Sequence, residues 1–352
     1  MSLRKRYRHR GRMKEAILYE KLRNQSVKCG VCRHRCIIAP GKRGYCKTRL
    51  NKDGILYTLI YNKVSSWSPN PIEKKPVFHF YPGSLCFSMG TLGCNFRCPG
   101  CQNWEISRAI AEEAGAGTEN ITPEQSIRMA FEHSCQGISW TFNEPAIWLE
   151  YTLEGARLAK EKGLYTVYVT NGFITPEGLE LMSPYLDVFR VDIKGFSEQT
   201  YKKISSVKAF SGVLESTVLA KRKYGMHVEC VTNVTPTVND DEGELKRMAE
   251  WIRDELGPDT PWHVTRFFPY LDLSHLPETP IQKLERVRKI GFDAGLHYVY
   301  IGNVPGHPGE HTYCYSCGEL LIEREIFWIR KFNIKDSKCP RCGTAIYGRF
   351  ES

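Results

Sequence analysis

Short apolar runs alternate with amphipathic helical patterns from about residue 130 to residue 303, and this alternation constrains the fold more than any other feature. Such runs are typical of buried strands, and each is followed by a helical pattern. The runs lie at 137–142, 164–172, 187–195, 226–234, 261–268 and 297–303, and the helical patterns at 146–163, from 176, 213–224, 241–256 and 280–294. With 85–93 as a first strand and a helix from Thr122, about six βα units result. They predict an α/β fold built on a partial (βα)6 TIM-like barrel.

Right-handed crossovers bring the carboxyl ends of all these strands to one rim of the barrel. That rim collects notable polar residues: a cysteine loop after the first strand, then Asn143, Glu144, Asn171, Asp192 and Lys194 at the ends of the next three. A lone polar residue is often a satisfied core group, but polar residues that recur at the same end of successive strands are harder to explain in that way. We therefore expect the active site at this rim.

The segment 90–105 (GTLGCNFRCPGCQNWE) places Cys94, Cys98 and Cys101 within eight residues. A Cys-x3-Cys-x2-Cys loop after a strand can bind an iron–sulfur cluster through its thiolates. Three ligands on a four-iron cube leave one iron open, as a missing protein ligand does in catalytic zinc sites. The alternative is a zinc knuckle completed by a distant His or Cys.

On such a barrel, this loop resembles that of the radical S-adenosylmethionine (SAM) superfamily. The resemblance implies a 4Fe–4S cluster whose open iron is chelated by the amino and carboxylate groups of SAM. It also implies that one electron cleaves SAM to methionine and a 5′-deoxyadenosyl radical, which abstracts a hydrogen atom. An external electron donor is then required.

The resemblance also assigns residues. Asn143 and Glu144 of TFNEP (141–145) stand where the family holds the SAM ammonium, and VDIK (191–194) is similar to the Asp-x-Lys strand of the pyruvate formate-lyase activating enzymes. Asp192 and Lys194 would then lie beside the methionine end of SAM, with a buried structural salt bridge as the alternative. Asn171 of VTNG is a further candidate, although Asn-Gly is also a common turn.

One position departs from the family pattern. The residue before the third cysteine is usually aromatic or apolar and packs against the adenine, whereas this chain has Gly100. Trp104 or Phe96 is the expected substitute. His263, on a predicted strand within the barrel, is a candidate for the substrate side, and a buried core histidine is the alternative.

Two further cysteine clusters flank the barrel. Cys314, Cys317, Cys339 and Cys342 form two knuckles around a strand-rich stretch, the pattern of a structural zinc ribbon. Near the N-terminus, another four cysteines fall within eighteen residues and predict either zinc or an auxiliary iron–sulfur cluster, which spacing alone does not decide: Cys29, Cys32, Cys36 and Cys46. The remaining three, Cys86, Cys135 and Cys230, lie in apolar contexts typical of the core.

Charge and hydropathy limit the possible partners and the cellular compartment of the protein. The net charge is +10, but the first twelve residues carry six Arg and Lys, which leaves +4 for residues 13–352. This basic arm is either a solvated tail or a contact for RNA or an acidic partner. No apolar run is long enough to cross a bilayer and no signal peptide is evident, so we expect a reducing cytoplasm, in which cysteines hold metals.

The likeness extends over nearly the whole chain, through 71–84 (PIEKKPVFHFYPGS), 261–267 and 298–307, to the AmmeMemoRadiSam-system radical SAM enzymes. It implies association with proteins of the AMMECR1 and Memo types. Phe268 and His311 depart from it, because a histidine and an asparagine are expected there. We expect a basic arm and helix over 1–25, a four-cysteine module over 26–80, the barrel over 81–303 and the ribbon over 304–352.

Three functions compete. The radical can act on a small molecule or nucleic acid, or it can act on a glycine of a partner enzyme, as the activating enzymes do. In the third, the chain is a non-catalytic metal scaffold that binds RNA, with an affinity that falls steeply with salt.

Overall fold

The computed structural model describes residues 13–110 and 117–350. Its main body is an eight-stranded sheet in the order β16-β15-β14-β13-β12-β11-β9-β8. Seven strands are parallel: β9 (Leu85–Gly90), β11 (Gly137–Trp140), β12 (Tyr165–Thr170), β13 (Val188–Asp192), β14 (His227–Val234), β15 (Trp262–Arg266) and β16 (Val299–Gly302). Within the described residues the edge strands β8 and β16 do not pair with each other, which confirms a partial barrel.

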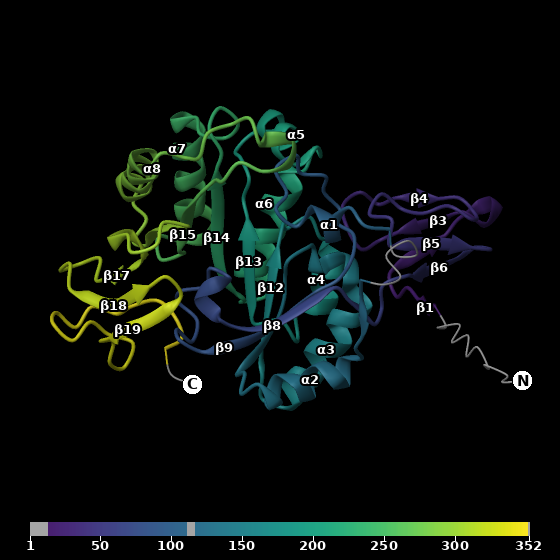
Figure 1. Ribbon diagram of the computed structural model, residues 1–352, viewed down its shortest axis with the longest axis horizontal. Coiled ribbons are helices and arrows are strands. Elements are labelled where there is room, and N and C mark those ends of the chain that lie inside the picture. Colours follow the sequence, from purple (N-terminus) through teal and green to yellow (C-terminus); the bar gives the residue numbers. More distant parts are fainter. Residues whose placement is uncertain (1–12, 111–116, 351–352) are drawn as a thin grey trace, which may run out of the picture.

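Helices connect the parallel strands (Figure 1), and their ends carry the expected caps. Thr122 and Gln125 form a capping box at α2, and Thr175 and Asp241 accept backbone hydrogen bonds at α4 and α7. The helices are α1 (Trp104–Ser107), α2 (Pro123–Glu132), α3 (Leu149–Glu161), α4 (Pro176–Met182), α5 (Glu198–Ser205), α6 (Phe210–Val218), α7 (Glu242–Trp251) and α8 (Ile281–Asp293).

The barrel sheet begins earlier than the sequence predicted, at β8 (Ser66–Pro71) instead of residue 81. This strand pairs antiparallel with β9. Its two prolines, Pro69 and Pro71, mask the strand signal in the sequence, and they are tolerated because β8 is an edge strand. The following segment crosses to β14, where the backbone N–H groups of Phe78 and His79 donate to the Glu229 carboxylate.

The N-terminal part contains two small antiparallel sheets. They are formed by β1 (Lys14–Glu15), β6 (Ile55–Thr58) and β5 (Arg49–Lys52), and by β2 (Tyr19–Lys21), β3 (Val27–Cys29) and β4 (Ile37–Ile38). The helix predicted within 1–25 is wrong for the described residues 13–25, which form short strands and a 3-10 turn. The basic arm, 1–12, lies outside the described residues. A pair of two-residue strands, β7 (Lys63–Val64) and β10 (Glu119–Asn120), joins this part to the barrel.

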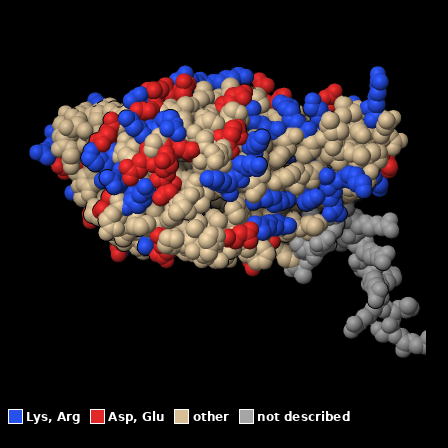
Figure 2. Space-filling view, turned by 90° about the horizontal axis from the view of Figure 1, so that it is seen from above, with Lys and Arg blue, Asp and Glu red and all other residues tan. Residues whose placement is uncertain are grey.

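The C-terminal part is a three-stranded sheet of β17 (Thr312–Tyr313), β18 (Leu320–Glu325) and β19 (Trp328–Phe332). It shares a hydrophobic cluster with Phe78, Tyr298 and Tyr300 of the barrel. Figure 1 shows it at the opposite end of the molecule from the N-terminal sheets. Lys and Arg side chains predominate on the N-terminal side of the surface seen in Figure 2. Among the described residues, no helix is both long and apolar enough to span a bilayer.

Candidate active site

The three-cysteine loop follows the carboxyl end of β9, at the rim of the barrel. Cys94, Cys98 and Cys101 interact electrostatically in every pairing, so the loop gathers their sulfur atoms in one place. None of them is in a disulfide. Burial raises the pKa of Cys98 to about 11 and that of Cys94 still further, so without a metal both stay protonated. A metal centre would deprotonate these thiols and use them as ligands.

Polar groups lie beside two of these sulfur atoms. The Phe96 N–H donates to Cys94 Sγ at 3.4 Å, and Ser107 Oγ lies 3.3 Å from Cys101 Sγ. The Nδ2 of Asn95, the residue after Cys94, is buried and has no hydrogen-bond partner within the described part of the chain. Donors to sulfur tune and stabilise iron–sulfur clusters. The loop therefore fits an iron–sulfur cluster held by three thiolates.

Asn143 fastens this loop to the end of β11. Its Nδ2 donates to the Gly93 carbonyl at 2.7 Å, and its Oδ1 accepts from the Thr91 N–H at 3.1 Å. Gly93 has a φ of +81° and lies directly before Cys94. The amide of Asn143 thus shapes the cysteine loop.

Glu144 is 1% exposed and has partners for both of its carboxylate oxygens. Oε1 accepts from the Ala146 N–H at 2.9 Å and from Thr170 Oγ1 at 2.7 Å, and Oε2 accepts from the Asn171 N–H at 2.8 Å. Burial raises the pKa of Glu144 to about 7, although these hydrogen bonds oppose the rise. The carboxylate therefore ties the end of β11 to the end of β12.

Asn171 lies beside the cysteine loop. Its Nδ2 donates to Asn95 Oδ1 at 2.7 Å and is 4.0 Å from Cys94 Sγ, while its Oδ1 accepts from the Phe173 N–H. The next residue, Gly172, has a φ of +73°, so the dipeptide also forms a turn. Both interpretations of the Asn-Gly pair are compatible with this geometry.

Asp192 and Lys194 form an ion pair of 3.0 Å at the end of β13, and both interact electrostatically with Cys98. Their side chains are 31% and 22% exposed, so the pair lies at the open mouth of the barrel. Burial opposes the ionisation of Asp192, but the charges of Arg190 and Lys194 outweigh it and hold its pKa below the usual value. Arg190 also bonds Asp192, and its Nε is buried without a partner among the described atoms.

The space beside Gly100 is occupied by a residue that sequence analysis missed. A Cβ placed on Gly100 would lie 3.0 Å from Leu273 Cδ1, because the turn at Leu271–Leu273 packs on the cysteine loop. The Asp272 N–H donates to the Pro99 carbonyl at 3.0 Å and anchors this turn. Leu273 lies 172 residues from Cys101, so local sequence carries no signal for the contact.

The three atoms nearest to a Cβ at position 100 belong to Leu273 and not to either of the two expected aromatic substitutes. Trp104 is 38% exposed, and Phe96 is buried against Phe173 with ring centroids 5.6 Å apart. The expectation that one of them replaces the aromatic residue at position 100 stays a prediction.

His263 is a buried core histidine. It is 1% exposed, and its Nε2 lies 2.6 Å from Glu229 Oε2. The ring meets the Phe78 ring edge-on and stacks on Tyr300. Burial opposes the charge on Glu229, but hydrogen bonds from His227 and His263 outweigh it and hold its pKa well below the usual range. The core interpretation of His263 is the one these contacts support.

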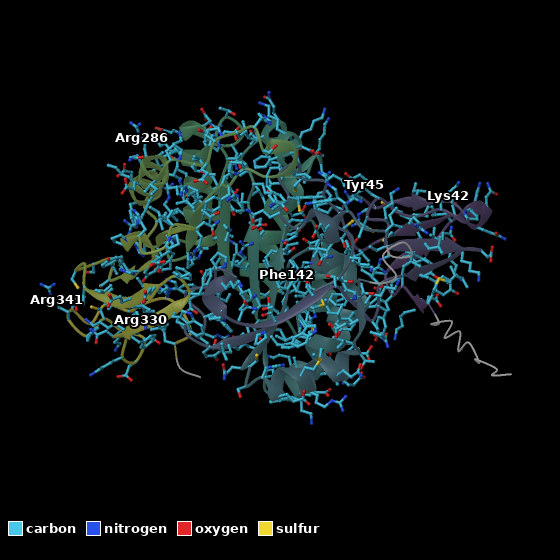
Figure 3. The ribbon with its side chains drawn as sticks, in the orientation of Figure 1. Lys42, Tyr45, Phe142, Arg286, Arg330 and Arg341 are labelled. Carbon is cyan, nitrogen blue, oxygen red and sulfur yellow. The ribbon has the colours of Figure 1, made fainter. Side chains whose placement is uncertain are left out.

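Lys75 is a second residue that sequence analysis missed. It is 4% exposed, and its Nζ lies 5.7 Å from the centre of the Phe142 ring, within the curve of the sheet where Figure 3 labels Phe142. Within the described part of the chain, no carboxylate forms an ion pair with Lys75. Burial lowers its pKa to about 8, and the charges of Lys74 and Arg190 add to the effect. A buried lysine beside the rim is a candidate for substrate contact.

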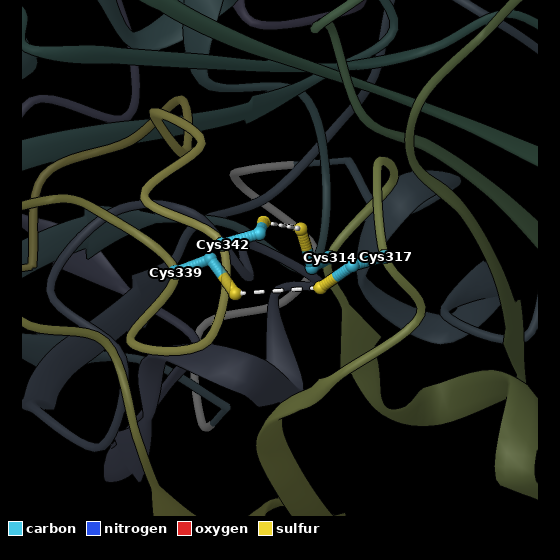
Figure 4. Close-up of side chains that lie close together, drawn as sticks. All are labelled: Cys314, Cys317, Cys339 and Cys342. Carbon is cyan, nitrogen blue, oxygen red and sulfur yellow. Dashed lines mark hydrogen bonds between the residues drawn. The ribbon is translucent and has the colours of Figure 1, made fainter.

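The ribbon cysteines form a compact cage. The sulfur atoms of Cys314, Cys317, Cys339 and Cys342 all lie within 4.8 Å of one another, which suits one tetrahedral metal ion (Figure 4). Outside the cysteine clusters, Cys86, Cys135 and Cys230 are 0%, 4% and 0% exposed, which confirms that they belong to the core.

The chain is similar in sequence to known proteins. The pattern of the Radical SAM superfamily matches residues 89–252. The uncharacterized protein MJ0808 of Methanocaldococcus jannaschii is 43% identical over 336 residues, which are 95% of this chain and 99% of that protein. The pyruvate formate-lyase-activating enzyme of Clostridium pasteurianum is 24% identical and covers 46% of this chain and 67% of its own length. A radical SAM methyltransferase structure from Sphaerobacter thermophilus has a TM-score of 0.48 and 15% identity, covering 66% of this chain and 71% of that one.

The chain belongs to the radical SAM superfamily, whose members use a 4Fe–4S cluster and SAM. Within that superfamily it is a SAM-dependent radical enzyme with homology to the pyruvate formate-lyase activating enzymes.

Proposed function

We propose that this enzyme binds a 4Fe–4S cluster through Cys94, Cys98 and Cys101 and abstracts hydrogen from a small molecule or nucleic acid at the barrel mouth. The observation that carries the proposal is a convergence at one rim. The three thiols, Asn171 and the Asp192–Lys194 pair meet there, although they come from the ends of β9, β12 and β13. When bound, the cluster supplies the electron that cleaves SAM to a 5′-deoxyadenosyl radical.

Different residues of this chain contact or position different parts of SAM. Asp192 and Lys194 present opposite charges at the barrel mouth, and these complement the ammonium and carboxylate of the methionine part. Asn143 and Glu144 act as positioning residues, because their polar atoms hold the cysteine loop and the strand ends together. Leu273 provides the apolar surface against the adenine in place of the missing side chain at Gly100.

The barrel interior favours a small substrate with an anionic group. Lys75 is buried there without an ion-pair partner among the described residues, and Arg190, which pairs with Asp192, has a buried Nε without a hydrogen-bond partner among them. A carboxylate or phosphate placed between them would compensate the charge of Lys75 and accept a hydrogen bond from Arg190 Nε. Such a group would leave the substrate near the rim where the radical forms.

The alternative function is activation of a glycyl-radical enzyme, and the homology to the pyruvate formate-lyase-activating enzyme favours it. An activase must admit a loop of a folded partner to the barrel mouth. Mixing the reduced enzyme and SAM with a candidate partner tests this function. A glycyl radical signal would support it, and a silent spectrum from active enzyme would count against it.

The proposal also includes zinc in the ribbon and association with proteins of the AMMECR1 and Memo types. Four cysteines in one cage fit a structural zinc ion. Co-purification of the full chain with the two protein types tests the association, and recovery of neither would contradict it.

The deciding experiment is release of 5′-deoxyadenosine from anaerobically reconstituted, dithionite-reduced enzyme given SAM. Cys98→Ala should abolish release, and Cys135→Ser, a change at a core cysteine outside the rim, should retain it. No release from iron-loaded enzyme, together with salt-sensitive binding to RNA, would instead favour the scaffold function.

A further inference from the structure

The four N-terminal cysteines converge although they come from separate turns. Cys29, Cys32, Cys36 and Cys46 interact electrostatically in every pairing. The Cys29 N–H donates to the Cys36 carbonyl at 3.0 Å and closes the first turn. Three of the four are buried, and none is in a disulfide. Four converging thiols of this kind are a ligand set.

This ligand set is wider than the cage of the ribbon. Among the described residues, only the ribbon cysteines bring three or more ligand atoms within 4.8 Å of one another. A tetrahedral zinc ion with bonds of about 2.3 Å needs sulfur atoms about 3.8 Å apart. Within the described residues, neither the N-terminal cysteines nor Cys94, Cys98 and Cys101, the loop that fits an iron–sulfur cluster, form a group of that compactness. An iron–sulfur cluster, which places several atoms between its ligands, fits such spacing better than a single ion does.

Donors and a fixed cation face these thiols. The Tyr45 N–H donates to Cys36 Sγ at 3.5 Å, and Thr48 Oγ1 lies 3.2 Å from Cys46 Sγ. Arg49 is 1% exposed and forms an ion pair of 2.6 Å with the buried Glu150; it also interacts electrostatically with Cys29 and Cys46, and its Nε is buried without a partner among the described atoms. An anionic centre would accept a hydrogen bond from this Nε.

The N-terminal turns touch the active-site loop directly. A Cβ on Gly93 would lie 2.4 Å from Thr48 Cγ2 and 2.9 Å from the Cys46 carbonyl, so only glycine allows this approach. His34, between Cys32 and Cys36, donates from Nε2 to the Asn95 carbonyl at 2.8 Å.

Two stacked rings span the boundary between the cysteine sets. The rings of His34 and Tyr45 lie 4.2 Å apart, and the Tyr45 hydroxyl interacts electrostatically with Cys94 and Cys98. Figure 3 labels Tyr45 where the N-terminal part meets the barrel. Tyr45 also precedes Cys46 in the chain. It is therefore adjacent to the N-terminal cysteines in sequence and to the active-site cysteines in space.

The surface around the N-terminal centre is basic. Residues 13–60 contain eleven Lys and Arg but three Asp and Glu. Exposed members include Lys21, Arg23, Lys42, Lys47 and Lys52. Figure 2 shows Lys and Arg on this side of the molecule. Such a face attracts an acidic protein.

We infer that Cys29, Cys32, Cys36 and Cys46 hold a second iron–sulfur cluster through which an electron reaches the active-site loop across the Tyr45–His34 boundary. The inference rests on the proposed function, because that function requires an electron donor. An acidic, low-potential carrier of the flavodoxin or ferredoxin class is oxidised by one electron at this site. The same electron then passes to the active-site centre, so the N-terminal centre returns to its oxidised state and no atom or proton is transferred.

Metal content tests the site without relying on activity. Wild-type enzyme should contain about six to eight iron atoms and one zinc per chain. A variant with Cys94, Cys98 and Cys101 all replaced by Ser should keep about two to four iron atoms and give an electron paramagnetic resonance signal on reduction. Wild-type enzyme with about four iron and two zinc, or an iron-free triple variant that remains folded, would overturn the inference.

Electron entry is tested with Cys36→Ser, beside Cys135→Ser as the matched control. Reduction of the active-site centre by flavodoxin, followed by loss of visible absorbance, should slow at least tenfold in Cys36→Ser and stay unchanged in the control. An unchanged rate in Cys36→Ser that has lost its N-terminal iron would overturn the relay. Zinc at the N-terminal site with normal 5′-deoxyadenosine release would refute this inference alone, whereas iron at both sites without release would refute the proposed function alone.

Discussion

At the scale of single residues, the buried charge of Lys75 lowers the free energy of unfolding, and other interactions in the fold must compensate for it. Burial, with Lys74 and Arg190 nearby, lowers its pKa to about 8 from the ordinary value of 10.5. The unfolded chain therefore binds the proton more tightly than the folded enzyme does. Below pH 8 the full penalty applies, about 3 kcal/mol, and it fades as the pH rises toward the unfolded value.

Replacing this amine should stabilise the substrate-free enzyme. Lys75→Met keeps the length of the side chain and removes the charge, so we expect unfolding to cost up to about 3 kcal/mol more at pH 7. The gain should shrink between pH 8 and 10.5. Chemical unfolding across this pH range measures it, with exposed Lys52→Met as control. A loss of stability in Lys75→Met at pH 7 would contradict the prediction and indicate a compensating anion.

Leu273 makes a contact whose loss should weaken SAM binding specifically. Leu273→Ala removes apolar surface beside Gly100 while the backbone anchor from Asp272 to Pro99 remains. We expect the SAM dissociation constant to rise about five- to thirtyfold, the equivalent of about 1–2 kcal/mol of apolar contact. Equilibrium binding to cluster-loaded enzyme measures it. Leu276→Ala, on the same connection, should bind normally; equal effects would mean that the whole connection has been disturbed.

At the scale of elements, the N-terminus of α4 joins the four-cysteine turns to the barrel. Thr175 Oγ1 accepts from the Gly178 N–H as the helix cap and donates to the Gly30 carbonyl at 2.5 Å. Thr122 caps α2 in the same way without reaching the N-terminal turns. Comparing variants of Thr175 and Thr122 therefore separates the contribution of the helix cap from that of the contact with the N-terminal turns.

Thr175→Val should therefore cost more than Thr122→Val. We expect about 2 kcal/mol against about 1 kcal/mol, because the first change also leaves the Gly30 carbonyl without a partner. Hydrogen exchange should accelerate over residues 27–38 in Thr175→Val alone. Equal losses and unchanged exchange would show that the junction does not depend on this hydroxyl.

The sequence predicted elements with strong periodicity and missed those that depend on distant contacts. All seven parallel strands lie within runs that alternate visibly with helices. Strand β8 escaped because its prolines hide an edge strand, and the expected helix near the N-terminus is replaced by two- and three-residue strands too short to carry a pattern. At the site, cysteine spacing and strand ends located the polar residues. Leu273 and Lys75 reach it from connections whose paths no local pattern specifies.

At the scale of the whole molecule, the ribbon is part of the barrel's support. Arg324 of β18 is 2% exposed, with its guanidinium 4.0 Å from the Phe78 ring centre and its Nη2 donating to the Phe78 carbonyl. The Phe78 N–H in turn donates to Glu229 inside the barrel. Loss of the ribbon metal should therefore destabilise the barrel as well as the ribbon.

Removing the metal from the ribbon should lower the melting temperature of the whole enzyme. Without its ion, a module this small unfolds. Arg324 and the apolar cluster around Tyr298 and Tyr300 then become exposed to solvent. We expect a fall of about 5 °C or more when a chelator extracts one zinc per chain. Calorimetry with parallel metal analysis measures it. Cys317→Ser should melt at the lowered temperature from the start and respond no further to the chelator. If wild-type enzyme loses its zinc and melts as before, the ribbon folds without its metal or contributes nothing to the barrel.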